Sequence, residues 1–161
     1  MDTKLKADIA ESAVVTELLR RGFKVLKPVG DRLPYDIAVD LNGKLIRIQI
    51  KHAWFVPANN YFAVDVRRTK TNRRVMRRER YNNEDFDLAI VYIDQGPVFY
   101  VIPVEIFVRY GSTIALVEVE KRQRKPIAAA YRERWDLLSS WAARSVTSGA
   151  IPVKFGEALS L

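Results

Sequence analysis

Cysteine is absent from this chain of 161 residues, and His52 is its one histidine. The lack of cysteine excludes disulfides, thiol nucleophiles and zinc sites built from cysteine, and one imidazole excludes metal sites that need two or more. A Ser-His-Asp triad would have to use His52 as its base. Side chains alternate along a strand, so His52 points to the face opposite Lys51, and we interpret it as a structural residue.

Long apolar runs are also missing. No stretch approaches the ~18 residues that a membrane-spanning helix needs. Asp2, Asp8 and Glu11 interrupt the N-terminal segment, which therefore does not resemble a signal peptide. We expect a soluble, cytoplasmic protein with no membrane partner. With 48% apolar residues the chain can bury a core, and its length predicts a single domain over residues 1–161.

Acidic residues are fewer than basic ones: 19 Asp and Glu stand against 27 Lys and Arg, which gives a net charge of +8 at pH 7. Residues 67–80 (RRTKTNRRVMRRER) contain eight basic residues and one acidic residue, Glu79, and thus have a net charge of +7. The rest of the chain, with 19 basic and 18 acidic residues, is nearly neutral at +1. This concentration of positive charge indicates a polyanionic partner rather than general solubility.

The apolar pattern predicts helices at both ends of the chain and short strands between them. We predict a first helix over residues 4–21 and a last one over 127–144, whose apolar stripe is either core or a subunit contact. Strands are predicted over 23–29, 35–41, 44–51, 61–66, 86–93, 98–102 and 113–119, with a short helical piece at 104–108. This order indicates an α/β (α+β) domain with a mixed β-sheet flanked by helices.

Asn42 and Gly43 lie between two of the predicted strands, and Asn-Gly is the strongest short signal for a β-hairpin with a type I′ turn. In that register one face of the hairpin is apolar and packs on the core. The other face brings together Asp36, Gln49 and Lys51. Opposed Cβ atoms in such a pair lie about 4.5–5.5 Å apart, so one cation could contact both Asp36 and Gln49.

On spacing alone, Asp36 and Lys51 also fit an exposed cross-strand ion pair, worth about 0.2–1 kcal/mol. The hairpin nevertheless resembles the signature of the PD-(D/E)XK nucleases: Asp36 is followed 13 positions later by Gln49-Ile50-Lys51. Residues 7–54 and 86–103 (FDLAIVYIDQGPVFYVIP) resemble the small nucleases encoded within bacterial group I introns. Two departures from the general pattern are Tyr35, which separates Pro34 from the aspartate, and Gln49 in place of an acid.

The resemblance implies a restriction-endonuclease-like core and a site for one or two Mg²⁺ ions. Asp36, the Gln49 oxygen and the Ile50 carbonyl would bind the metal, and Lys51 would orient the attacking water and stabilise charge on the phosphate. The first helix of this family often supplies a glutamate that reaches the metal or its water. Glu11, which borders the apolar stripe of Val14 and Leu18, fits that place, and Asp8 is the second candidate.

A charge run such as residues 67–80 is usually a solvated loop, but here eight cations would repel one another unless a partner neutralised them. Arginine outnumbers lysine by seven to one, as expected where bidentate contacts to phosphate or guanine matter. We predict a DNA-contacting insert, either a β-ribbon or a helix. Its candidate DNA-binding residues are Arg67, Arg68, Lys70, Asn72, Arg73, Arg74, Arg77, Arg78 and Arg80.

Together these features predict a site-specific, Mg²⁺-dependent double-strand DNA endonuclease of the intron-homing type. The resemblance implies products with 5′-phosphate and 3′-hydroxyl ends. Cutting both strands needs two active sites, so we expect a homo-oligomer, dimer or tetramer. The alternatives are a Holliday junction resolvase or repair nuclease on the same fold, and a non-catalytic DNA-binding protein with a decayed site.

Overall fold

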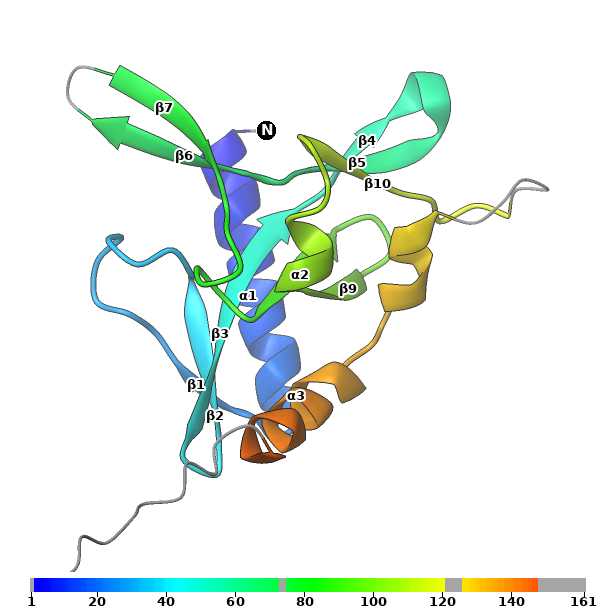
Figure 1. The fold of residues 1–161 in the computed structure, drawn as a ribbon. Coiled ribbons are helices and arrows are strands. Elements are labelled where there is room, and N and C mark those ends of the chain that lie inside the picture. Colours follow the sequence, from blue (N-terminus) through cyan, green and yellow to red (C-terminus); the bar gives the residue numbers. More distant parts are fainter. Residues whose placement is uncertain (1, 73–74, 121–125, 148–161) are drawn as a thin grey trace, which may run out of the picture.

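The computed structural model describes residues 2–72, 75–120 and 126–147 (Figure 1). Its centre is a five-stranded mixed sheet in the order β1-β2-β3-β8-β9, in which β3 pairs with β8 in parallel and the other neighbours are antiparallel. This confirms the predicted mixed sheet flanked by helices. The strands are β1 (Lys24–Leu26), β2 (Ile37–Leu41), β3 (Lys44–His52), β8 (Leu88–Ile93) and β9 (Val98–Pro103).

One face of the sheet is covered by the first helix, α1 (Thr3–Arg20), which packs on β3 and β8. Ala10, Val14 and Leu18 recur at helical spacing and are buried, so the predicted apolar stripe is the face that α1 turns to the core. The side chain of Asp2 caps the helix by accepting a hydrogen bond from the backbone N–H of Lys4 (3.2 Å). Because α1 is packed on the sheet, the position of Glu11 on this helix is fixed relative to β3.

The other face is covered by a smaller three-stranded sheet, β10-β5-β4, and by the short helix α2 (Val104–Phe107). All six residues of β8 are buried because both faces of this strand lie under other elements, which explains its unbroken apolar sequence. The strands of the smaller sheet are β4 (Trp54–Val56), β5 (Tyr61–Asp65) and β10 (Thr113–Leu116), with a 3-10 turn η1 (Pro57–Asn59) between the first two.

The hairpin of β2 and β3 has the register that the Asn-Gly turn predicts, with Leu41 opposite Lys44 and Ile37 opposite Ile48. Asn42 and Gly43 both have positive φ, 54° and 84°, as a type I′ turn requires. Five residues on the predicted core face of the hairpin are buried, whereas Leu41 and Lys44 beside the turn are half-buried. The five buried residues are Ile37, Val39, Ile46, Ile48 and Ile50.

Residues 127–144 do not form the single helix that we predict from sequence. A 3-10 segment, η2 (Ile127–Tyr131), is followed by extended Arg132 and by Glu133 with φ 53°, and α3 (Asp136–Thr147) begins only then. The break is caused by the edge of β9, which needs partners for its backbone. Glu133 donates its N–H to the Phe99 carbonyl (2.8 Å) and accepts the Phe99 N–H on its carboxylate (2.8 Å).

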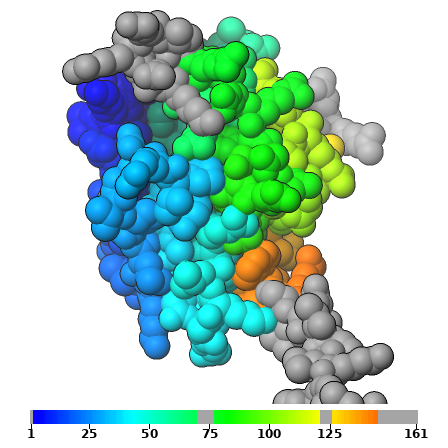
Figure 2. Space-filling view, turned by 60° about the vertical axis from the view of Figure 1, so that its left-hand side comes forward, coloured from blue at the N-terminus to red at the C-terminus, as the bar shows by residue number. Residues whose placement is uncertain are grey.

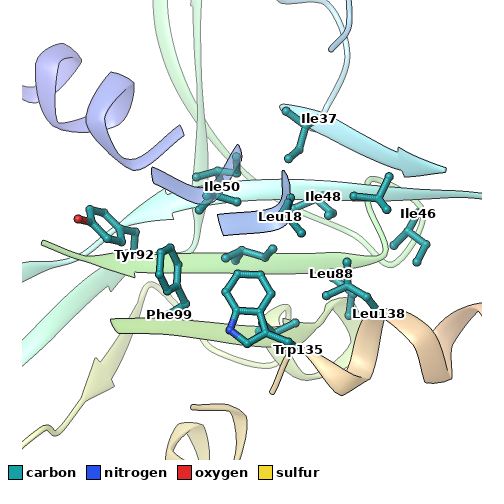
Figure 3. Packing of buried hydrophobic residues seen from close by; sticks show 14 of the residues in the cluster. Leu18, Ile37, Ile46, Ile48, Ile50, Leu88, Tyr92, Phe99, Trp135 and Leu138 are labelled. Carbon is teal, nitrogen blue, oxygen red and sulfur yellow. The ribbon is translucent and has the colours of Figure 1, made fainter. Parts of the chain in front are cut away.

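Two apolar residues after this break, Trp135 and Leu138, belong to the core. The ring of Trp135 lies 5.2 Å from that of Phe99, and Trp135 and Leu138 are buried in the same cluster as Leu18 (Figure 3). Ile127, in contrast, is 72% exposed and is not part of that cluster. Of the two roles that the sequence leaves open for this apolar stripe, Trp135 therefore has the core one.

The basic segment forms a two-stranded antiparallel ribbon of β6 (Arg67–Asn72) and β7 (Val75–Arg80), separate from both sheets. It extends away from the five-stranded sheet at the upper left of Figure 1. We call it the basic ribbon. The sequence left open whether this segment is a β-ribbon or a helix, and the structure shows a β-ribbon. Within the part of the chain that is described, no helix is long and apolar enough to span a membrane.

Candidate active site

A cleft of about 1020 Å³ lies where α1, the loop after β1, the end of β3 and the base of the basic ribbon meet. Figure 2 shows the face on which the start of α1 (dark blue), the loop after β1 (lighter blue) and the chain near the end of β7 (green) come together. All four residues that the sequence predicts as catalytic line this cleft: Glu11, Asp36, Gln49 and Lys51.

Asp36 and Gln49 are joined by the hairpin register. Asp36 precedes β2 directly, and its N–H donates to the Ile48 carbonyl (3.0 Å), which sets its side chain opposite Gln49. Oδ2 of Asp36 accepts two hydrogen bonds, from Nε2 of Gln49 (2.7 Å) and from the N–H of Ile50 (2.6 Å). The same Gln49 nitrogen donates to the Ile50 carbonyl (3.2 Å). Three polar groups thus converge on one point at the floor of the cleft.

The carboxyl of Asp36 sits in surroundings that disfavour its charge. Burial raises the pKa of Asp36 above its ordinary value, and the nearby carboxylate of Glu11 acts in the same direction. The Ile50 N–H and the charges of Lys51 and Lys27 act against this rise without cancelling it. A carboxylate in such a position gains more from a bound cation than one in free solvent does.

Lys51 is half-buried and is not part of an exposed ion pair with Asp36. Its ammonium donates a hydrogen bond to the carbonyl oxygen of Arg67 (3.1 Å) and lies 5.0 Å from the centre of the Tyr81 ring. Burial lowers the pKa of Lys51, although the charges of Asp36 and Asp65 partly offset the effect. The lysine is therefore a desolvated cation whose position is set by the two ends of the basic ribbon.

Glu11 faces the cleft from α1, where it forms an ion pair with Lys27 of the loop after β1. The hydrogen bond and the charge of Glu11 raise the pKa of Lys27. Asp8, the second candidate on this helix, is exposed and does not line the cleft. Of the two acids, the structure brings Glu11 to the other predicted site residues.

The oxygens of this site fit a magnesium ion. A carboxylate, a backbone carbonyl and an amide oxygen are all hard ligands, which Mg²⁺ prefers to nitrogen or sulfur. In the structure, the amide NH₂ of Gln49 donates to both Asp36 and the Ile50 carbonyl. It thereby satisfies the two oxygens that a cation would bind. No cluster of three His, Cys, Asp or Glu side chains suited to a metal exists among the described residues.

Arg67, Arg68 and Arg78 of the basic ribbon line the cleft, whereas Arg77 and Arg80 are exposed on β7. Pairing across the ribbon sets Arg67 opposite Arg80 and Lys70 opposite Arg77. Like charges directly opposite one another destabilise a ribbon. A bound polyanion would reduce this repulsion, so the pairing indicates a polyanionic partner. Among the other predicted contacts, Lys70 and Asn72 belong to β6 and only their backbone is described, and Arg73 and Arg74 lie outside the described residues.

Three residues that contact predicted site residues in the cleft were not themselves predicted as site residues from the sequence. Lys27 pairs with Glu11, Asp65 lies at the base of the ribbon, and the buried Tyr81 supports Lys51 with its ring. Tyr81 follows the basic segment directly and Asp65 lies two residues before it, and this closeness in sequence was the available signal. Lys27 carries no local signal, because its contact with α1 exists only in the folded chain.

Comparison with known proteins finds a family and a similar solved structure. A family model described as PD-(D/E)XK endonuclease matches residues 1–138. Among solved structures, the chain is similar to a bacterial homing endonuclease, I-Ssp6803I, with 46% sequence identity and a TM-score of 0.84. The alignment covers 91% of this chain and 99% of that one. No curated protein matches the chain.

Proposed function

Because this chain belongs to the PD-(D/E)XK endonuclease family, we propose that it is a site-specific, Mg²⁺-dependent homing endonuclease encoded within a group I intron. The predictions of a PD-(D/E)XK fold and of a nuclease are confirmed by the family match and by the likeness to a homing endonuclease. The substrate proposed is double-stranded DNA that carries the intron insertion site.

The observation that carries the proposal is the meeting of an oxygen cluster, a desolvated lysine and a basic ribbon in one cleft. Asp36, Gln49 and the Ile50 carbonyl converge on its floor, within the same cleft as Lys51. The ribbon reaches out from the rim of the cleft, so DNA held by the ribbon would pass over the cluster. If the basic segment were only a solvated loop, there would be no reason for it to border the cleft that contains Asp36 and Lys51.

Asp36, the Gln49 amide oxygen and the Ile50 carbonyl would hold Mg²⁺, and Glu11 would add a carboxylate from α1. Bound there, Mg²⁺ supplies Lewis-acid polarisation of a phosphoryl oxygen. Gln49 must turn its amide so that the oxygen replaces the NH₂ group now facing Asp36. Glu11 must likewise leave its ion pair with Lys27, whose exposed ammonium is then available to a phosphate.

Lys51 acts on the reacting phosphate itself. Its ammonium lies in the same cleft as Asp36, where it stabilises the negative charge that grows on the phosphate and orients the attacking water. An ammonium that has lost part of its hydration does this more strongly than one in free solvent. Cleavage of the 3′ P–O bond by water leaves a 5′-phosphate and a 3′-hydroxyl.

The described residues of each chain provide the cleft with Asp36 and Lys51, and cutting duplex DNA requires one reaction on each strand. We therefore propose a symmetric homo-oligomer, dimer or tetramer, in which two clefts face the two strands. Size-exclusion chromatography with light scattering, with and without DNA, tests this part.

The test of the function is incubation of the protein and Mg²⁺ with plasmid DNA carrying the uninterrupted gene into which the intron inserts. A single cut at the insertion site supports the proposal. Four-way junctions are included as a second substrate, and preferential cutting of junctions would indicate a resolvase instead. A protected footprint without Mg²⁺-dependent nicking would indicate a DNA-binding protein without catalytic activity.

A further inference from the structure

Both ends of the basic ribbon touch the ammonium of Lys51. At the start of the ribbon the carbonyl of Arg67 accepts its hydrogen bond (3.1 Å), and directly after its end the ring of Tyr81 lies 5.0 Å away. No residue of the five-stranded sheet other than Lys51 itself takes part in these two contacts. The position of the lysine head therefore depends on how the ribbon is anchored.

Asp65, the last residue of β5, anchors the base of the ribbon on both of its strands. Its Oδ1 accepts the backbone N–H of Arg67 (2.9 Å) and lies 3.6 Å from Nε of the same residue. Its Oδ2 lies 3.6 Å from Nη1 of Arg78 on β7. The Asp65 carboxylate thus accepts the N–H of Arg67, and the carbonyl of the same Arg67 accepts the hydrogen bond from Lys51. The carboxylate also attracts Arg78 on the other strand of the ribbon.

The anchor is incomplete at one point. Nε of Arg67 is buried and has no hydrogen-bond partner among the described residues. Its distance of 3.6 Å from Asp65 is too long for a hydrogen bond. An unpaired buried N–H is unfavourable, so a small closure of the ribbon toward Asp65, or a phosphate oxygen at this place, would be stabilising.

Resting on the proposed function, we infer that Asp65 is a positioning residue: it clamps Arg67 and Arg78 and so fixes the Arg67 carbonyl that holds the Lys51 ammonium. DNA binding by the ribbon and placement of the lysine are then coupled through one carboxylate. The ribbon binds DNA through its arginines whether or not Asp65 is charged. Cleavage, in contrast, needs the lysine in its place and depends on the clamp.

The first test is Asp65→Asn, which keeps an oxygen for the Arg67 N–H and removes only the charge. Asp65→Ala is the second variant. We expect the single-turnover cleavage rate at saturating protein to fall at least about 10-fold, a loss of about 1.4 kcal/mol of transition-state stabilisation. The Kd for the same duplex, measured without divalent metal, stays within about threefold of wild type. Both variants are first checked for an unchanged melting temperature.

The second test needs no DNA. Lys51 is modified by formaldehyde and cyanoborohydride in the free protein, and the extent of modification is followed by peptide mass spectrometry. Because the released ammonium is more accessible, Asp65→Asn should raise the modification rate of Lys51 at least about threefold. Glu105→Gln is the matched control, since it removes one acidic charge from an exposed position on α2 outside the cleft.

An unchanged cleavage rate, an unchanged Lys51 modification rate, or a parallel fall of cleavage and affinity would each overturn the inference. A parallel fall would mean that Asp65 serves only the shape of the ribbon. If the wild-type protein cuts no DNA, the proposed function fails, but the modification experiment still decides the role of Asp65. The two failures are therefore distinguishable.

Discussion

Nε2 of Gln49 donates a 2.7 Å hydrogen bond to Oδ2 of Asp36. A glutamate at this position would place two carboxylates side by side in a buried site, where like charges raise one pKa strongly. The amide avoids this repulsion and gives Asp36 a hydrogen bond. A site with Gln49 has one negative charge fewer for binding a cation than a site with glutamate would have. If Gln49 binds Mg²⁺ as proposed, replacing it by glutamate changes both the stability of the protein and its response to the metal.

Gln49→Glu should lower the melting temperature of the metal-free protein at pH 8 and increase the upward shift produced by 10 mM Mg²⁺. The first effect comes from the lost hydrogen bond and the new charge repulsion, and the second from the additional anionic ligand. Differential scanning fluorimetry measures both. Gln95→Glu, at an exposed turn between β8 and β9, is the control for added charge. A Mg²⁺ shift no larger than that of wild type would count against Gln49 as a metal ligand.

Lys51→Met should reduce cleavage by about 10²-fold to 10³-fold or more, because the cation that stabilises the phosphate is lost. DNA binding should remain nearly intact, since the arginines of the ribbon are unchanged. The melting temperature should rise, because a partly desolvated ammonium is replaced by an apolar side chain of similar length. Rate, Kd and melting temperature are measured on the same preparation. Equal losses of cleavage and binding would refute the assignment of Lys51.

The affinity for duplex DNA should fall about 10³-fold or more between 50 and 200 mM salt if at least six cations of the ribbon meet phosphates. Arg77→Gln should reduce the slope of log K against log salt by about 1. Arg20→Gln, at the end of α1 and outside the cleft, should leave the slope unchanged. Fluorescence anisotropy with a labelled duplex gives these slopes. A complex that is insensitive to salt would exclude the ribbon as the main contact.

Glu118 should make the stability depend on pH in the acid range. Burial acts to raise the pKa of Glu118, but hydrogen bonds from Arg132 and Tyr100 outweigh it and hold the pKa below its usual 4.5. The Arg132 contact, 3.0 Å from Nη2 to Oε2, ties the segment before α3 to the end of the smaller sheet. The contribution of the Glu118 carboxylate to stability is complete above pH 4.5. It is lost as the pH falls through the pKa that Glu118 has in the folded protein, which is lower than 4.5.

Glu118→Gln should therefore be less stable than wild type at pH 7, by about 1–2 kcal/mol. The difference should shrink as the pH is lowered below 4.5. Urea unfolding at several pH values measures it, and Glu120→Gln, an exposed neighbour, is the control. A difference between wild type and Glu118→Gln that stays constant down to pH 3 would contradict the proposed linkage.

Much of the candidate site could be predicted because it is local in sequence. The Asn42-Gly43 turn allows one hairpin register, and this register alone places Asp36 opposite Gln49 and on the same face as Lys51. The spacing of Val14 and Leu18 set the core stripe of α1 and hence the side on which Glu11 lies. Charge counting likewise separated the ribbon from the nearly neutral remainder of the chain.

Other features could not be read from local patterns. The apolar spacing across residues 127–144 matches one helix, yet the edge of β9 required backbone partners, and Arg132 and Glu133 left the helical conformation to supply them. A pattern of apolar residues shows that a segment has a buried face, but not which neighbouring backbone needs its hydrogen bonds.

The sequence by itself excluded cysteine-based chemistry and metal sites with two imidazoles, since the chain has no cysteine and one histidine. It also determined the hairpin that presents the carboxylate, amide and lysine groups of the site, because turn type and side-chain alternation are local properties. Only the tertiary structure decided that Lys51 meets Arg67 and Tyr81, that Glu11 meets Lys27, and that Asp65 holds the ribbon. These contacts join residues on different elements, and their formation depends on the packing of the whole chain.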